Sequence, residues 1–399
     1  MAGASVEELK ARADAEVDRL APVLVELSHD LHAHPELMFE EHHAHQVLTD
    51  AIAAEGLQVV RHAHGLDTAF RVDAGSEGPI VAVCCEYDAL ENIGHACGHN
   101  VIATAGLGAG LAAAALAEAA GGRVRLLGTP AEEGGNGKGL MLDDGAFEGV
   151  DAALMVHPGD RELDRMTTLA VGVVLVTYHG HASHAASAPW LGRNALDAAI
   201  NGYNNISALR QQMAPDQRIH GAFQEVPTRS NVIPERVSIR WVCRGASVSS
   251  VKDLLPRMIA CLEAGGMAAG CQVEMTEPRI GSQVLDNAVL VERYVANSQS
   301  IGRSPVRPGP ATGNVFGSTD MGVVSRNFPS IHPVIALAPE GVAIHERAFA
   351  AAAASEAADR AVVDGAKALA RTVIDIWSDA ELRNAAWRQL DADKAADPL

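Results

Sequence analysis

Short apolar runs alternate along this chain with stretches of helical spacing, which is the pattern of an α/β protein. The runs Ile80–Cys85, Arg123–Leu127 and Ala152–Val156 predict buried strands of a mixed sheet. The Ala/Leu/Gly stretch Val101–Ala120 is apolar on nearly every face and predicts a buried helix. We therefore expect a large α/β domain with helices packed on its sheet.

The pattern changes after Met166. A long strand, Leu169–His179, begins a series of elements whose order is strand-helix-strand-strand-helix-strand. The later elements are predicted at Ala195–Met213, Arg218–Glu225, Arg236–Arg244, Val248–Gly265 and Gln272–Glu277. This βαββαβ order predicts an inserted α+β, ferredoxin-like domain. The predicted boundaries are 1–178 and 286–399 for the two parts of the first domain, and 179–285 for the insert.

The chain after the insert returns to the first domain. Its pattern predicts a helix at Ala288–Ser300, a last sheet strand at Ile331–Ala336 and a helix at Ala350–Trp377. The charged stretch Glu381–Leu399 is predicted to be an exposed tail.

Composition narrows the class of protein. The 399 residues are 48% hydrophobic, and the mean hydropathy is +0.06. The net charge of -19 argues against a nucleic-acid partner. The Val101–Ala120 run is too weakly hydrophobic for a confident membrane span, and Met1–Leu20 carries charges throughout, unlike a signal peptide. The six cysteines do not resemble a disulfide framework. We expect a cytoplasmic protein that binds no membrane.

Side chains that can bind metals follow three successive predicted strands. Cys97 and His99 come after the first, with Gly98 between them to allow a sharp turn. The pair Glu132-Glu133 follows the second strand, and His157 follows the third. Each motif alone is more often structural: a buried Cys beside a loop His, or a solvated acidic turn. Their repeated position at strand ends indicates a metal site.

A separate group of histidines lies near the N-terminus. It could be a metal tract or a solvated helix and loop, and the spacing favours the second interpretation because it gathers the imidazoles on no single face. The group consists of His29, His32, His34, His42, His43 and His45.

Taken together, these motifs resemble the metal-dependent amidohydrolase family of aminoacylases, glutamate carboxypeptidases and auxin-conjugate hydrolases. The shared motifs are His95-Ala96-Cys97-Gly98-His99, Glu132-Glu133-Gly134, His157-Pro158, the string from Gly180 through His184 to Asn194-Ala195, and His345. The residues from Glu86 to Asn100 and Gly317-Ser318-Thr319-Asp320 are most similar to the aminobenzoyl-glutamate hydrolase branch and to related dipeptidase-like proteins. The resemblance extends from about Leu31 to Phe349.

The resemblance implies a zinc-peptidase catalytic domain with an inserted lid domain, through which two copies of the chain form a homodimer. It further implies that Glu132 is the general base and that Asp88 orients a ligand. His184 would reach the partner subunit's active site and stabilise the oxyanion, while Asn231 and Arg244 would hold the substrate's carboxylate. The implied metal ligands are Cys97, His99, Glu133, His157 and His345.

The sequence departs from the family pattern at three positions. Asn100 and Ile102 stand where the nearest relatives often have Asp and His, and Glu86 stands where the wider family has His. We therefore expect one or two divalent ions per subunit, which could be zinc, manganese or cobalt.

The implied reaction is hydrolysis of the amide bond of an N-acyl or N-aroyl amino acid or a dipeptide by a metal-activated water. Two alternatives remain open at this point. One is a related hydrolase that removes an amine from an aromatic or heterocyclic substrate, and the other is a non-catalytic binding subunit that keeps the fold.

Overall fold

The computed structural model describes residues 4–309 and 317–398 and divides the chain into two compact units. The first unit contains the chain up to Thr167 together with Val284–Ala395, and the second contains Thr168–Gln283 and the last residues from Ala396. The division falls before the long strand β7 (Ala170–His179), whereas the sequence-based boundary at 178 lies near that strand's end. Residues 1–3 and Leu399, which belong to predicted terminal segments, lie outside the described residues.

The first unit is built on a six-stranded mixed sheet with the order β1-β2-β4-β3-β5-β12. Strands β4, β3, β5 and β12 run parallel to one another, while β1 and β2 are antiparallel additions at one edge. The bounds are β1 Val60–Arg61, β2 Phe70–Ala74, β3 Ile80–Glu86, β4 Arg123–Thr129, β5 Val150–Leu154 and β12 Ser330–Ile331. The mixed α/β sheet predicted from the sequence is confirmed.

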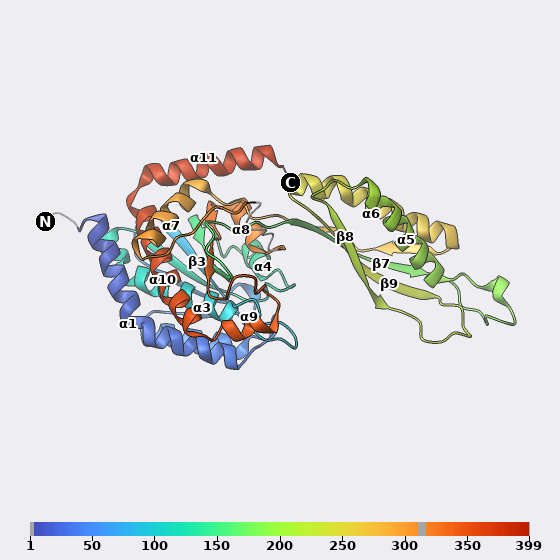
Figure 1. Ribbon diagram of the computed structural model, residues 1–399, viewed down its shortest axis with the longest axis horizontal. Coiled ribbons are helices and arrows are strands. Elements are labelled where there is room, and N and C mark those ends of the chain that lie inside the picture. Colours follow the sequence, from blue (N-terminus) through green and yellow to red (C-terminus); the bar gives the residue numbers. More distant parts are fainter. Residues whose placement is uncertain (1–3, 310–316, 399) are drawn as a thin grey trace. The chain divides into compact units, whose positions relative to one another are not determined.

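Helices cover this sheet (Figure 1). Their bounds are α1 Val6–Ala33, α2 His42–Ala54, α3 His99–Ala120, α4 Gly137–Asp143, α7 Ala288–Ser300, α8 Met321–Asn327, α9 Arg347–Ala352, α10 Glu356–Ser378 and α11 Ala380–Ala396, with a 3₁₀ turn at Ala63–Gly65. Among them, α3 packs against α1, α10, β3 and β4 and is buried along most of its length.

Glycines allow α3 to lie this close to its neighbours. A Cβ at Gly106 would lie 2.6 Å from the carbonyl oxygen of Cys84, and one at Gly110 would lie 2.6 Å from a methyl group of Leu126. Among the described helices, α3 alone has the length and apolar content of a membrane span. Its burial between helices and sheet explains that apolar content by core packing.

Two C-terminal expectations were wrong. The segment predicted as an exposed tail forms α11, which buries Leu382, Ala386 and Leu390 at helical spacing. The predicted last sheet strand is divided: β12 pairs with β5, whereas β13 (Val334–Ala336) pairs with β6 (His157–Gly159) in a separate two-stranded sheet. The residues between them, His332 and Pro333, interrupt the strand, and proline has no backbone N–H to continue a ladder.

The second unit has the predicted βαββαβ order. Its antiparallel sheet has the order β10-β7-β9-β8, and β11 also pairs with β7. The bounds are α5 Ala195–Leu209, β8 Arg218–Glu225, β9 Arg236–Gly245, α6 Val248–Ala269, β10 Gln272–Met275 and β11 Arg279–Gly281, with 3₁₀ turns at Pro189–Leu191 and Arg210–Gln212. This is the strand order of a ferredoxin-like domain.

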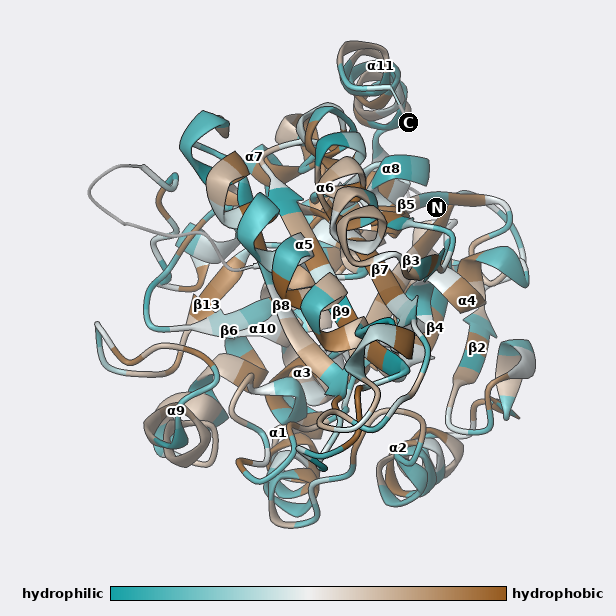
Figure 2. Cartoon of the chain, turned by 90° about the vertical axis from the view of Figure 1, so that its right-hand side faces the viewer, coloured by the Kyte–Doolittle hydropathy of each residue, from teal (hydrophilic) through white to brown (hydrophobic). Residues whose placement is uncertain are grey.

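The second unit also has its own hydrophobic core. Helices α5 and α6 pack on each other and on the sheet, and Trp241 and Tyr178 are fully buried between these layers. The Tyr178 hydroxyl donates a hydrogen bond to the Leu262 carbonyl at 3.1 Å, so its polar atom is satisfied. Figure 2 shows apolar residues on the strands β5 and β7 and hydrophilic residues on much of α2.

Candidate metal centre

Five side chains that could bind a metal meet around Cys97 in the first unit. One ligand atom each from Cys97, His99 and His157 lies within 4.8 Å of the others, and the same holds for Cys97, Glu133 and His345. Four of these side chains lie in segments that follow β3, β4 and β5, and the fifth lies just before α9. Residues far apart in sequence therefore converge beyond the C-terminal ends of the parallel strands. The structure thus brings together all five predicted ligands.

Gly98 permits the tight turn between Cys97 and His99. Its φ of 76° lies in the left-handed region, and a Cβ there would lie 2.5 Å from Cγ of Pro158. The residue is also the N-cap of α3, so the helix begins at His99. A side chain at position 98 would separate the loop from the segment that carries His157.

Asp88 fixes two of the candidate ligands. One of its carboxylate oxygens accepts a hydrogen bond from Nδ1 of His99 at 3.1 Å, and the other accepts one from the backbone N–H of Glu133 at 2.9 Å. The bond to Nδ1 leaves Nε2 of His99 free to bind a metal. The carboxyl group is almost completely buried. This geometry matches the orienting role that the resemblance implies for Asp88.

The backbone also positions the other two histidines, through the ring of His157 and through the main chain of His345. Nδ1 of His157 donates to the Pro158 carbonyl at 2.7 Å, and its Nε2 lies 3.5 Å from Sγ of Cys97. His345 has a φ of 67° and donates its backbone N–H to the Ala96 carbonyl at 2.8 Å. Its Nε2 lies 3.4 Å from Oε1 of Glu133.

The electrostatics of the centre favour a bound cation. Burial raises the pKa of the Cys97 thiol and lowers the pKa of His157 to about 3. Burial alone would lower the pKa of His99, but Glu86 and Cys97 raise it well above its usual value. Burial, followed by Glu86, raises the pKa of Glu132. A divalent ion would reverse the effect on the thiol, because a coordinating thiol is deprotonated.

Unpaired buried atoms provide a test of whether a metal fits. Nε2 of His99 and Oε1 of Glu86 are buried 3.1 Å apart, and Oε1 of Glu133 is buried 3.4 Å from Nε2 of His345, yet none of these three buried atoms makes a hydrogen bond. Such atoms are costly to bury unless something binds them. A set of one sulfur, three imidazole nitrogens and one carboxylate suits a divalent transition metal. The residues present therefore fit the ion that the resemblance implies.

A buried ion cluster beside this centre was missed in the sequence. The Lys138 ammonium group, on α4, is fully buried and contacts the Glu86 carboxylate and Oδ1 of Asp320, the latter at 2.7 Å. Asp320 also accepts the backbone N–H of Lys138 at 2.9 Å. Glu86 in turn lies 3.1 Å from Nε2 of His99, and both have ligand atoms within 4.8 Å of a Glu132 oxygen. The available signal was Lys138 itself, which interrupts a glycine-rich segment that follows Glu132-Glu133.

Asn100, one of the positions where the sequence was expected to depart from the family pattern, forms hydrogen bonds within the core. Its side-chain amide donates to Oγ of Ser28 at 3.0 Å and to the Ala353 carbonyl at 2.8 Å. The residue therefore ties α3 to α1 and to the end of α9. These bonds satisfy the amide nitrogen of Asn100, whereas its Oδ1 is buried without a hydrogen-bond partner.

The remaining predicted site residues lie in the second unit and separate into two places. His184 forms a β-bridge with Val232, and the Asn231 carbonyl accepts the N–H of Ala185 at 3.0 Å, so His184 and Asn231 are neighbours. Arg244 lies near the opposite end of β9, opposite Val171. From Arg236 to Arg244 this strand spans about 27 Å at about 3.4 Å per residue. One subunit therefore cannot place Asn231 and Arg244 on the same carboxylate.

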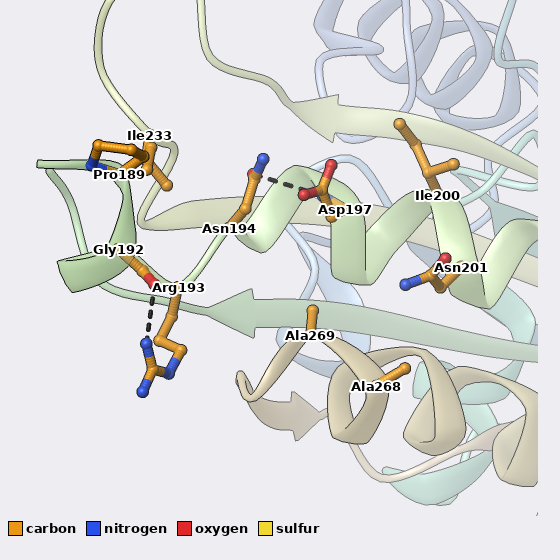
Figure 3. Close-up of a pocket in the computed structure, with 10 residues that line it drawn as sticks. All are labelled: Pro189, Gly192, Arg193, Asn194, Asp197, Ile200, Asn201, Ile233, Ala268 and Ala269. Atoms are coloured by element: carbon orange, nitrogen blue, oxygen red, sulfur yellow. Dashed lines mark hydrogen bonds between the residues drawn. The ribbon is translucent and has the colours of Figure 1, made fainter. Parts of the chain in front are cut away.

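The second unit also has a hollow of about 540 Å³ beside α5 (Figure 3). It is lined by Pro189, Gly192, Arg193, Asn194, Asp197, Ile200, Asn201, Ile233, Ala268 and Ala269. Figure 3 shows Asn194 bonded to Asp197, where Asn194 caps α5. None of the five candidate metal ligands lines this hollow. We therefore place the candidate centre where those five side chains converge, and not at the hollow.

Comparison with known proteins identifies the family of this chain. The model of peptidase family M20/M25/M40 matches residues 79–375. The mouse Xaa-Arg dipeptidase is 38% identical over 388 residues, covering 94% of this chain and 90% of that protein. One of the subunits of the Escherichia coli p-aminobenzoyl-glutamate hydrolase is 31% identical over 278 residues, covering 64% of this chain and 58% of that protein.

Solved structures share the fold. The aminobenzoyl-glutamate utilization protein from Klebsiella pneumoniae has a TM-score of 0.69 at 18% identity, covering 91% of this chain and 98% of that one. A dinuclear metal-binding M20 peptidase from Bacillus subtilis has a TM-score of 0.66 at 18% identity, covering 90% and 99%. The predicted α/β domain with an inserted α+β domain is thus confirmed. The chain belongs to peptidase family M20/M25/M40 and is a metallohydrolase of amide bonds.

Proposed function

We propose that Glu132 is the general base of this hydrolase and that the five side chains around Cys97 hold its metal. The observation that carries the proposal is the convergence of Cys97, His99, Glu133, His157 and His345, with Glu132 next to them. A divalent ion bound there supplies Lewis acidity, which makes water a usable nucleophile near neutral pH. Zinc, manganese and cobalt all suit this mixed set of ligands, at one or two ions per subunit.

Glu132 moves the protons of the reaction. Its carboxylate takes a proton from the attacking water and returns it to the leaving amine. Burial and Glu86 raise the pKa of Glu132 in the metal-free protein, and a cation nearby opposes that rise, so the carboxylate is ionised when the metal is present. Asp88 keeps His99 and the Glu133 backbone in place during these steps.

The proposed substrates are dipeptides, with a preference for a cationic C-terminal residue. This preference rests on the 38% identity to the mouse Xaa-Arg dipeptidase and on the net charge of -19, which attracts cationic ligands. Metal-loaded enzyme should be assayed with Ala-Arg, Ala-Glu, an N-acetyl amino acid, p-aminobenzoyl-glutamate and an aryl amine. Higher kcat/KM for Ala-Arg than for the others is expected, and a preference for p-aminobenzoyl-glutamate would overturn the assignment.

A homodimer through the second unit completes the proposed site. Trp190 and Leu191 are 73% and 58% exposed there, which is unusual for large apolar residues and fits an interface. His184 and Asn231 would act on the partner's substrate, whereas Arg244 would hold the carboxylate in its own subunit. The length of β9 between the two places supports this division. We also propose a cytoplasmic location, since all six cysteines are free.

The Glu132→Gln variant tests the base. Glutamine keeps the size of the side chain but cannot accept the proton, so metal content should stay at the wild-type level while kcat falls by about 10²–10⁴-fold. Metal is measured by elemental analysis and turnover by the dipeptide assay. Retention of more than about a tenth of the activity would exclude the role.

Mixed dimers test how the subunits share the site. A Glu132→Gln chain refolded with a His184→Ala chain should regain activity, because one of the two sites then has both intact groups. Glu132→Gln with Arg244→Ala should stay inactive, because both losses affect groups that each site takes from its own chain. Mass measurement verifies that mixed dimers form. Activity in the second mixture, or its absence in the first, would contradict the proposed division.

A further inference from the structure

A second group of potential metal ligands lies in the first unit and shares no residue with the centre around Cys97. It consists of Asp30, His34 and His43, each with one ligand atom within 4.8 Å of the others. The other N-terminal histidines have separate partners: His29 bonds to Asp359, and His32 bonds to the Ala350 carbonyl. The predicted solvated helix and loop therefore describes the group except for the buried His45, but it does not predict that Asp30, His34 and His43 converge.

The carboxylate of Asp30 lies between the two imidazoles. Its Oδ2 is 2.6 Å from Nε2 of His43, and its Oδ1 is 3.2 Å from Nδ1 of His34. The two rings are 4.6 Å apart between centroids. Nδ1 of His34 is also 2.9 Å from the Asp30 carbonyl, and donation to this oxygen leaves Nε2 of His34 available as a ligand.

Local structure produces this arrangement from two helices. Asp30 and His34 are four residues apart at the end of α1, a spacing that puts side chains on one helix face, and His34 is the C-cap. His43 lies in the first turn of α2, where the Glu36 carboxylate accepts its backbone N–H at 2.8 Å. A cation at the end of α1 is also favoured by that helix's dipole.

We propose that Asp30, His34 and His43 form a second cation site, which takes a divalent transition metal such as zinc or cobalt. Two imidazoles and one carboxylate suit these ions, whereas magnesium and calcium prefer sites made of oxygen atoms. The side chains of the three residues are 33%, 57% and 37% exposed, so solvent can supply further ligands and the ion can exchange.

Occupancy would tie together the two ends of the loop at residues 35–41. This loop reaches the segments that carry Asp88 and Glu132: the Glu36 carbonyl accepts the N–H of Ala89 at 2.8 Å, and Oε1 of Glu41 accepts the N–H of Ala131 at 2.8 Å. A metal that bridges α1 and α2 would therefore restrain the loop against both segments.

Cobalt titration of the chelator-treated full-length protein tests the site. The wild type should bind one equivalent of Co²⁺ more than the double variant His34→Ala/His43→Ala. That equivalent should lack the thiolate-to-cobalt charge-transfer absorption that Cys97 gives, because the second site has no sulfur. Its affinity should fall at least about tenfold in Asp30→Asn, a variant of unchanged size, since loss of even an outer-shell partner costs about 10–100-fold.

His42→Ala is the matched control, because His42 is adjacent and exposed but pairs with Glu40 instead. It should bind cobalt like the wild type. In Cys97→Ser the equivalent without charge-transfer absorption should remain, and hydrogen exchange in residues 35–41 should slow when it binds. Equal stoichiometry and affinity in the wild type, the double variant and Asp30→Asn would overturn the proposal, whatever the outcome for the proposed catalytic function.

Discussion

Asp88 shows how single side chains hold the candidate centre in place. Its two oxygens bind groups on different segments, Nδ1 of His99 and the backbone of Glu133, so the loops after β3 and β4 are fixed to each other. An orienting carboxylate behind a histidine ligand was implied by resemblance. The second bond, to the Glu133 backbone, depends on how the two loops pack, and no spacing in the sequence reveals it.

Cys97→Ser should lower the amount of bound metal. The thiol is buried within reach of His157 and Glu133, and a serine hydroxyl is a poorer ligand for a transition metal than a thiolate. Elemental analysis after dialysis measures the loss. Cys84→Ser, at a buried position in β3, is the matched control and should keep its metal. Full metal retention in Cys97→Ser would show that Cys97 is a buried structural residue and not a metal ligand.

His45 should make the free energy of unfolding depend on pH. Burial, followed by His62, lowers its pKa from 6.5 to about 4. Because the folded pKa lies below the unfolded one, the unfolded state binds more protons between these values, so stability falls as pH falls from about 6.5 towards 4. Urea unfolding at several pH values should show a shallower fall for His45→Asn. An unchanged slope would contradict the predicted shift.

Elements were predicted best where the sequence pattern is long and periodic. The strands β3, β4 and β5 and the helix α3 were found because buried parallel strands are continuous apolar runs. The missed helix α11 had a detectable signal, since Leu382, Ala386 and Leu390 repeat every four residues within a charged segment. The position of Lys138 in a glycine-rich segment was its only signal, and that signal does not show burial, because the burial depends on Glu86 and Asp320 from other elements.

Lys138→Met should be strongly destabilising. The ammonium group joins α4 to the end of β3 and to the N-cap of α8, and its removal leaves two buried carboxylates without their cation. Breaking a buried ion pair in this way costs about 3–5 kcal/mol. Urea unfolding measures the loss. Lys394→Met, at an exposed position in α11, should change stability by less than about 0.5 kcal/mol. Similar values for both variants would refute the interpretation.

The whole molecule consists of two units with separate cores. All five candidate ligands belong to the first unit, whereas the second is held by its own packed residues, including Trp241 and Tyr178. The last residues of the chain also join the second unit, where Asp397 accepts the N–H of Ser249 at 2.9 Å. A metal bound by these five side chains would therefore act directly on the stability of the first unit.

Metal removal should lower the thermal stability of the first unit alone. A metal that binds only the folded state stabilises it by mass action, and its ligands span residues from Cys97 to His345 of that unit. Calorimetry with and without a chelator should shift one of two transitions. Hydrogen exchange should rise in β3 and α3 but not in β7 and β9. Equal loss of protection in both units would contradict this independence.

The chain passes between the two units at few points, near residues 167–168, 283–284 and 395–396, and this has a consequence for divergence within the family. Substitutions and length changes inside the insert leave every candidate metal ligand untouched. With the substrate contacts proposed above for His184, Asn231 and Arg244, selection on specificity would proceed in one stretch of the gene while the segments that carry the candidate metal ligands, encoded on either side, are inherited unchanged. Relatives that act on chemically different amides can arise by such substitutions and length changes in the insert, without a new catalytic centre.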